Sequence, residues 1–147
     1  MKIESIKFKA KRLDGKGWVC GYFYEENGNT YIIEDRQKDS VLNRNEAVLI
    51  DPTTICQFTG RYAEDYTPIY ESDVIECTYF DEQDNDTHVT GVVAWEEDVW
   101  GFVLKEYMFE NLNVGNRYRG EEYIILPCTD DTESVIKVIG NKFDKKK

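Results

Sequence analysis

Apolar and polar residues alternate along much of the chain, with the period of two that is typical of β-strands with one buried face. Residues 6–11 alternate between apolar side chains and lysines, and aromatic and β-branched runs follow at residues 18–24 and 30–33. Between those two runs, Asn27-Gly28 is a strong hairpin signal, because both residue types tolerate positive φ. The first part of the chain is therefore predicted to form an antiparallel sheet.

Further short β-type runs, each bounded by turn residues, occupy residues 47–50, 54–59, 74–80, 88–95, 99–104, 122–126 and 133–139. The third, fourth and fifth of these predict a three-strand meander. Residues 105–113 predict a short helix, because Tyr107, Met108 and Leu112 lie near helical spacing. About nine short strands with regular turn signals predict a mainly β fold of barrel or sandwich type, with at most one or two short helices.

The length of 147 residues suits one domain that buries its own core. We expect a single domain over residues 1–147. The alternative is a division of this domain into two subdomains, residues 1–60 and 69–147, joined by the loop 61–68. No apolar run approaches the roughly 20 residues that cross a bilayer, and the first residues lack the apolar segment of a signal peptide. A cytoplasmic protein without a membrane partner is predicted.

Charge is distributed unevenly along the chain. The whole sequence has 18 basic and 29 acidic residues, a net charge of −11. Residues 1–16 carry +4 and residues 142–147 carry +3, so residues 17–141 carry −18. Such an acidic body disfavours binding of phosphate backbones and suits either solubility alone or contact with a basic partner.

Residues with catalytic or metal-binding chemistry are sparse. The single histidine, His88, follows the acidic turn 81–86, and no phosphate-binding loop or hydrolase motif is present. The turn lacks the glycine and glutamate of a calcium loop, so a solvated hairpin turn is predicted. The cysteines lack zinc-ligand spacing and are predicted to be buried, reduced thiols: Cys20, Cys56, Cys77 and Cys128. No enzyme activity, cofactor or metal is predicted.

Aromatic residues are abundant, and most are expected in cores and cross-strand pairs. Trp95 and Trp100 flank the acidic turn 96–98 and are the candidate exposed aromatics. Because acidic neighbours disfavour nucleic acid, exposed aromatics here favour a protein–protein contact.

The stretch from residue 54 to residue 77 has the composition of either a ligand site or a corner between strands. The corner interpretation is favoured, since Gly60 and Pro68 bracket a turn and Asp73 can accept hydrogen bonds from nearby backbone N–H groups. A site for a ligand or partner at the same place remains the alternative. The candidate residues are Gln57, Thr59, Gly60, Tyr70, Glu71 and Asp73.

Several pieces of the chain occur together in a recognisable order. They are Lys7-Phe8-Lys9-Ala10, Trp18-Val19-x-Gly21-Tyr22, Asp51-Pro52-x-Thr54-Ile55-x-Gln57-Phe58-Thr59-Gly60, Pro68-Ile69-Tyr70-Glu71-Ser72-Asp73-Val74-Ile75, Gly91-Val92-Val93, Gly101-Phe102 and Val138-Ile139-Gly140-Asn141. This order resembles the YopX-like family of small proteins carried by bacteriophages and prophages. Ser72 stands where that family usually has glycine, Cys56 stands where glycine is common, and residues 61–67 replace the usual loop.

The resemblance implies a mostly β phage protein in a bacterial host cell, and it supplies no catalytic residues. Three functions stay open. The first is an accessory protein that acts through contacts with a protein partner and through self-association as a homo-oligomer. The second is an acidic nucleic-acid mimic or decoy that binds a basic protein. The third is a weak nucleic-acid binding module that uses the lysine-rich ends.

Overall fold

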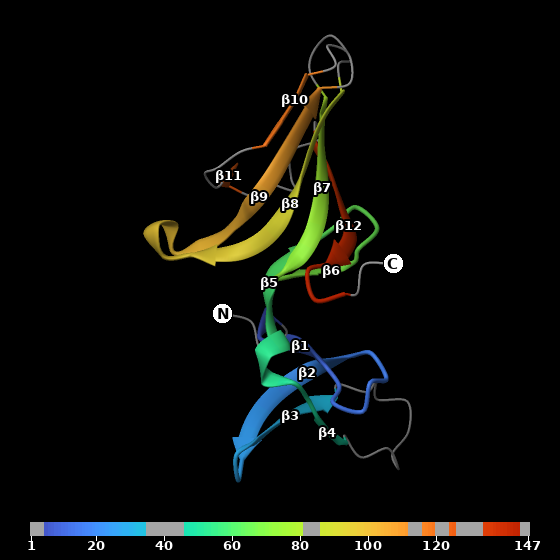
Figure 1. Ribbon diagram of the computed structural model, residues 1–147, viewed down its shortest axis with the longest axis vertical. Helices are drawn as coiled ribbons and strands as arrows, with labels where there is room; N and C mark the ends of the chain where they lie inside the picture. The colour runs from blue at the N-terminus through green and yellow to red at the C-terminus, as the bar shows by residue number, and fades with distance from the viewer. Residues whose placement is uncertain are drawn as a thin grey trace. The chain divides into compact units, whose positions relative to one another are not determined.

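The computed structural model describes residues 5–34, 46–80, 86–111, 116–119, 124–125 and 134–144. The chain divides into two compact units, Met1–Phe58 and Thr59–Lys147. Twelve strands and two short 3-10 turns are described, and the strands form two antiparallel sheets with open ends (Figure 1). The expectation of a mainly β chain is confirmed.

The first sheet is built mainly from the first unit. Its strands are β1 (Phe8–Lys11), β2 (Trp18–Glu26), β3 (Asn29–Glu34), β4 (Ala47–Leu49), β5 (Cys56–Tyr62) and β6 (Pro68–Tyr70), with the 3-10 turn η2 (Pro52–Thr54) before β5. The hydrogen-bonded order is β4-β3-β2-β1-β5-β6. Residues 35–46 are mostly polar and show no firm period, so an exposed excursion is predicted there. All of them except residue 46 lie outside the described residues.

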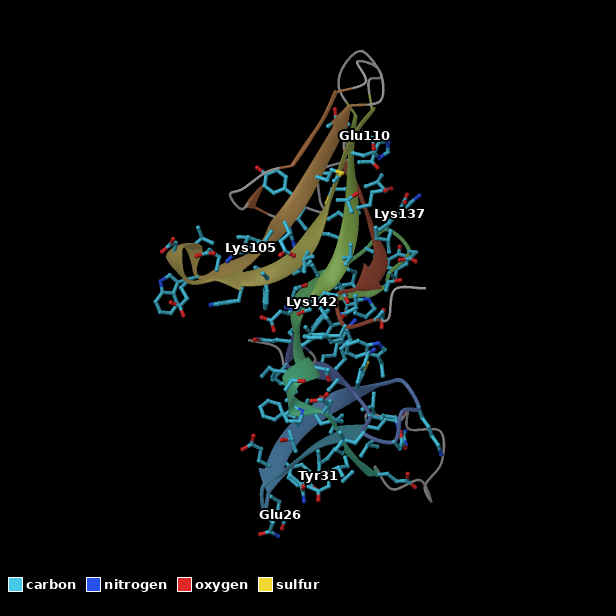
Figure 2. All side chains as sticks on the ribbon, in the orientation of Figure 1. Glu26, Tyr31, Lys105, Glu110, Lys137 and Lys142 are labelled. Atoms are coloured by element: carbon cyan, nitrogen blue, oxygen red, sulfur yellow. The ribbon has the colours of Figure 1, made fainter. Side chains whose placement is uncertain are left out.

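The predicted hairpin at Asn27-Gly28 is confirmed. Both residues have positive φ, 52° and 79°, and Glu26 pairs directly with Asn29. Across the same two strands the rings of Tyr24 and Tyr31 stack with centroids 5.2 Å apart (Tyr31 is labelled in Figure 2). Local turn chemistry and a cross-strand aromatic pair therefore set the same register.

The alternation at residues 6–11 separates an apolar face from a lysine face. Ala10 is fully buried in a small core with Val19, Ile32 and Ile50. The lysines lie over aromatic rings instead: the Nζ atoms of Lys9 and Lys11 lie 5.0 and 5.5 Å from the centroid of the Trp18 ring, and that of Lys7 lies 4.4 Å from the Phe58 ring. The alkyl stems and charges of these lysines thus cover one face of the sheet.

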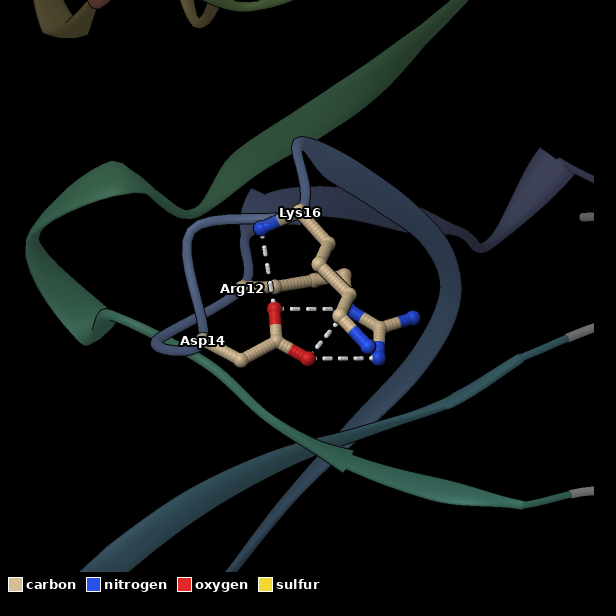
Figure 3. Close-up of polar contacts among 3 residues, drawn as sticks. All are labelled: Arg12, Asp14 and Lys16. Carbon is tan, nitrogen blue, oxygen red and sulfur yellow. Dashed lines mark hydrogen bonds and ion pairs between the residues drawn. The ribbon is translucent and has the colours of Figure 1, made fainter.

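An exposed ion pair closes the turn between β1 and β2 (Figure 3). Arg12 donates through Nη2 to Asp14 Oδ2 at 2.8 Å and through Nε to Oδ1 at 3.1 Å. The backbone N–H of Lys16 donates to Asp14 Oδ1 at 3.0 Å. The hydrogen bond from the Arg12 side chain, followed by that from Lys16, lowers the pKa of Asp14 from 3.8 to about 2.

The stabilising effect of Asp14 is expected to depend on pH. Because its pKa is depressed in the folded state, the effect is complete above pH 3.8 and is lost as the pH falls toward about 2. The variant Asp14→Asn should therefore be slightly less stable than the wild type near neutral pH, and this difference should disappear as the pH falls through about 2. Urea unfolding of both proteins across this range measures the difference, and a difference that does not change with pH would contradict the prediction.

The second unit holds the second sheet. Its strands are β7 (Asp73–Phe80), β8 (Asp86–Glu96), β9 (Gly101–Asn111), β10 (Asn116–Arg119), β11 (Ile124–Ile125) and β12 (Ser134–Asn141), with the 3-10 turn η3 (Glu97–Val99) between β8 and β9. The order is β10-β9-β8-β7-β12, and β11 also pairs with β9. The predicted meander β7-β8-β9 is confirmed, and its core is Ala63, Ile69, Ile75, Cys77, Val89, Val93, Leu104 and Ile136.

The helix predicted at residues 105–113 is wrong. Strand β9 continues to Asn111 and pairs with β8 on both sides of an irregularity, where Thr90 pairs with Met108 but Val92 pairs with Lys105. Two residues of β9 thus lie opposite one residue of β8, and Glu106 takes a positive φ of 51°. This β-bulge shifts the side-chain alternation, which explains why the sequence mimics helical spacing.

The connection after β5 is shorter than predicted. Strand β5 runs on to Tyr62 and β6 starts at Pro68, so the loop spans residues 63–67 rather than 61–68. The boundary between the two compact units falls within β5, after Phe58.

Candidate functional site

Asp73 is the most deeply buried of the six candidate residues of the corner, with none of its surface exposed. Its Oδ2 accepts a hydrogen bond from the backbone N–H of Tyr70 at 2.8 Å, and its Oδ1 accepts one from Asn141 Nδ2 at 3.0 Å. Asn141 Oδ1 in turn accepts from the N–H of Phe143 at 2.9 Å. A carboxylate with two buried donors joins the β6–β7 turn to the end of β12.

Thr59 and Gly60 have local roles in the β5–β6 pair. The hydroxyl of Thr59 donates to the carbonyl of Ile69 at 2.8 Å and accepts from the N–H of Arg61 at 3.2 Å. Gly60 has a φ of 83°, and a Cβ there would meet nothing within 4 Å. Backbone conformation, rather than lack of space, explains the glycine.

Ser72 lies in the turn between Tyr70 and Asp73 with a positive φ of 69°. Its N–H donates to the carbonyl of Val93 at 2.7 Å, and its carbonyl accepts from the N–H of Lys142 at 2.9 Å (Lys142 is labelled in Figure 2). Both backbone groups therefore hold the turn in place. The left-handed conformation gives a physical reason for a glycine at this position.

The variant Ser72→Gly is expected to raise the free energy of unfolding by about 0.5–1 kcal/mol, because glycine adopts this φ without strain but is more flexible when unfolded. Ser72→Ala keeps the unfavourable conformation and serves as the control. Thermal unfolding ranks the three proteins. A glycine variant less stable than the alanine variant would contradict the argument from backbone strain, and a loss of stability in both variants would mean that the Ser72 side chain itself stabilises the turn.

Of the three remaining candidate residues of the corner, Tyr70 is buried, whereas Gln57 and Glu71 have more exposed positions. Gln57 belongs to the first unit, where it pairs with Phe8 across β5 and β1 and has an exposed side chain. Glu71 is half-buried in the β6–β7 turn. The contacts of Thr59 and Asp73 go to backbone groups and to Asn141, and this pattern favours the scaffold interpretation of the corner.

His88 lies in the β7–β8 pair, opposite Thr78. Its Nδ1 is 3.0 Å from the Thr78 hydroxyl and 4.0 Å from Glu76 Oε1. A catalytic triad needs the nucleophile and the carboxylate on different ring nitrogens. Both contacts here use the same nitrogen, so the arrangement does not fit a triad. The predicted acidic turn 81–86 lies outside the described residues, apart from the backbone of Asp86.

The cysteines differ in exposure. Cys56 and Cys77 are fully buried, and burial raises the pKa of the Cys77 thiol to about 12. Cys20 is exposed, so its predicted burial is wrong. It pairs with Lys9 across β2 and β1 and therefore shares the lysine face of the sheet. Cys128 lies outside the described residues.

Thiol labelling of the native protein should separate these residues. Cys20 is expected to react readily with a maleimide at neutral pH, whereas Cys77 stays protonated and shielded and should react only after unfolding. Peptide mapping by mass spectrometry assigns the modified sites, and Cys20→Ser should remove the fast reaction. Rapid labelling of Cys77 in the native protein would contradict the structure.

A hollow of about 260 Å³ lies at the turn between β8 and β9, and it is lined by Trp95, Glu97 and Trp100. We call it the tryptophan hollow. The turn is the short coil that joins the two long strands in Figure 1. Trp95 is 42% exposed and Trp100 is 84% exposed. Two large aromatic side chains and one carboxylate therefore meet at an accessible place.

Neighbouring contacts hold the wall of the tryptophan hollow. The ring of Trp95 meets that of Phe102 edge to face, with centroids 5.2 Å apart. Glu96 forms an ion pair with Lys105, with 2.6 Å between Glu96 Oε2 and Lys105 Nζ (Lys105 is labelled in Figure 2). This contact lowers the pKa of Glu96. The same carboxylate lies 3.5 Å from the N–H of Asp98 at the start of η3.

Sequence reasoning missed two residues. Asn141 is 68 positions away from Asp73 in the sequence. Its only signal in the sequence was its place in the segment 138–141, which is part of the resemblance to the family. Glu97 lines the tryptophan hollow, and its available signal was an acidic turn between two tryptophans. Asn141 was missed because it is far from Asp73 in the sequence. Glu97 was missed because a turn has no side-chain periodicity that would single out one of its carboxylates.

Within the described segments, no three or more His, Cys, Asp or Glu residues gather in a way that could hold a metal ion. The same segments contain no helix that is long and apolar enough to cross a membrane.

A protein-family model described as YopX protein matches residues 3–146. No curated protein and no solved structure gives a significant match to the chain.

Proposed function

The chain belongs to the YopX family, and from that premise we propose that it is a phage or prophage accessory protein that acts in the bacterial cytoplasm as a protein-binding module. Its contact surface includes the tryptophan hollow. The observation that carries this proposal is the exposure of Trp100, which is 84% exposed and lies beside a second exposed tryptophan.

Exposed tryptophans at a hollow favour binding of a protein. Burial of apolar surface contributes about 25 cal/mol per Å², so covering an indole ring is worth a few kcal/mol to a complex. Tryptophan is also among the residues that most often dominate the energy of protein interfaces. No catalytic arrangement is part of this proposal, since the contacts of His88 and the corner do not assemble one.

Self-association is the simplest form of this activity. Light scattering coupled to size exclusion, at micromolar concentrations, should show a dimer or larger species for the wild type. Trp100→Gly should shift it toward the monomer if the tryptophan hollow is the contact. A strict monomer at every concentration would remove self-association from the proposal and leave a different protein as the partner.

A second candidate function is supported by the distribution of charge. Residues 1–58 contain nine basic and nine acidic residues, whereas residues 59–147 contain nine basic and 20 acidic residues. The entire net charge of −11 thus belongs to the second unit. A unit this acidic suits a decoy that competes with nucleic acid for a basic protein.

Competition experiments test the decoy. Binding to a basic DNA-binding protein should weaken strongly with salt and should be displaced by duplex DNA. Binding that DNA does not displace would reject the decoy. Direct binding of single- or double-stranded DNA to the chain at low salt would favour the nucleic-acid binding module instead.

A further inference from the structure

We propose that the tryptophan hollow binds a cationic side chain, a lysine or arginine, presented by a basic segment of the partner. The side chain would lie against Trp95 and Trp100 with its charge directed to the Glu97 carboxylate. This inference rests on the proposed protein-binding function and names the chemistry that the same surface recognises.

The composition of the lining selects the class of ligand. Two indole rings favour an apolar or cationic group, but covering Glu97 with a purely apolar side chain would desolvate a carboxylate without a partner. Lysine and arginine combine an apolar stem with a cationic head, and their heads interact favourably with aromatic faces. Anionic ligands are disfavoured by Glu97 and by its neighbour Asp98.

The two carboxylates at the tryptophan hollow, those of Glu96 and Glu97, differ in whether they already form an ion pair. Glu96 already forms an ion pair with Lys105 at 2.6 Å. Among the described residues, no ion pair within 4.0 Å involves Glu97, which is the carboxylate that lines the tryptophan hollow. The Trp95 ring is held by its edge-to-face contact with Phe102. One wall is therefore fixed in advance, and one carboxylate remains for a ligand.

The backbone of Trp100 supplies a separate argument. Trp100 ends η3 in the left-handed conformation, with a φ of 51°. Glycine or asparagine is the usual choice at such a position, and a bulky residue is strained there. The indole ring is mostly exposed, so core packing does not explain its presence. A strained residue with an exposed aromatic side chain points to a role in recognition.

Nuclear magnetic resonance provides a direct test, because the chain has only three tryptophans and each gives its own indole N–H signal. N-acetyl-lysine methylamide and N-acetyl-arginine methylamide are the probes, and N-acetyl-glutamine methylamide is the uncharged control. The signals of Trp95 and Trp100 should shift saturably with the cationic probes. Trp18, in the first unit, is the internal reference and should shift little.

Matched variants separate the proposed contact from general attraction. Glu97→Gln and Asp98→Asn each remove one negative charge from the same turn, but only Glu97 lines the tryptophan hollow. Glu97→Gln should weaken binding by about fivefold or more, and Asp98→Asn by less than about twofold. Trp100→Gly suits the left-handed backbone, so it should abolish binding without lowering the melting temperature.

Equal effects of Glu97→Gln and Asp98→Asn, or equal binding of the glutamine control, would overturn the inference. Loss of self-association in Trp100→Gly without any binding of the cationic probes would also overturn it, while leaving the protein-binding function in place. Cationic binding at the tryptophan hollow supports the inference even if the protein is monomeric. Failure of the proposed function itself would appear as partner binding or self-association that Trp100→Gly leaves intact.

Discussion

Asp73→Ala is expected to lower the free energy of unfolding by about 3 kcal/mol, because each buried donor that loses its acceptor costs roughly 1–3 kcal/mol. The donors affected include the backbone N–H of Tyr70 and the Nδ2 of Asn141, at 2.8 and 3.0 Å from the carboxylate oxygens. Thermal or urea unfolding of the variant measures the loss.

A nearby carboxylate provides the control for Asp73. Glu71 lies two residues earlier in the same turn and is half-buried, so Glu71→Ala should change stability by less than about 0.5 kcal/mol. A double-mutant cycle with Asn141→Ala should show coupling between Asp73 and Asn141. Unchanged stability of Asp73→Ala together with lost partner binding would restore the ligand-site interpretation of this corner.

Gly91→Ala is expected to destabilise the second unit by about 2 kcal/mol, the cost typical of overpacking a core. A Cβ at Gly91 would lie 2.7 Å from Leu104 Cγ, 2.9 Å from the Lys105 carbonyl oxygen and 3.0 Å from Tyr107 Cβ. The bulge in β9 brings this backbone close to β8, so the carbonyl cannot move away without breaking strand pairing. Urea unfolding measures the change.

Gly140→Ala is the matched control for Gly91. Gly140 also lies in a strand at a register irregularity, but a Cβ there would meet nothing within 4 Å. Its substitution should be nearly neutral. If Gly91→Ala proved as well tolerated as Gly140→Ala, the close approach of β9 to β8 at the bulge would be refuted.

Local features of the sequence predicted much of the strand architecture. The Asn27-Gly28 turn, the alternation at residues 6–11 and the order of the meander each depend on neighbours that are close in sequence. Turn geometry and side-chain alternation are sufficient to predict such elements. The same local features also indicated that Trp95 and Trp100 flank an acidic turn.

Predictions failed where a distant partner decided the outcome. The spacing of residues 105–113 suggested a helix, but pairing with β8 and a bulge at Glu106 kept the segment extended. Cys20 is exposed although it lies in an apolar run, whereas Cys56, which also pairs with Lys9, is fully buried. Propensity is a weak guide when cross-strand pairing supplies the stabilisation.

The sequence by itself determined a mainly β chain of the YopX family, with its hairpin, its meander and a corner marked by glycine, serine and aspartate. Only the tertiary structure decided that Asp73 meets Asn141, that β9 crowds Gly91, and that Glu97 lines a hollow with Trp95 and Trp100. Strand and turn preferences act over a few residues and can therefore be predicted from short stretches of the sequence. The buried hydrogen bond of Asp73 depends on which distant segments pair, and the crowding of Gly91 depends on the register of β8 and β9, so both are settled only when the sheets assemble. The hollow depends on the three-dimensional path of one turn, which places residues 95, 97 and 100 around the same space.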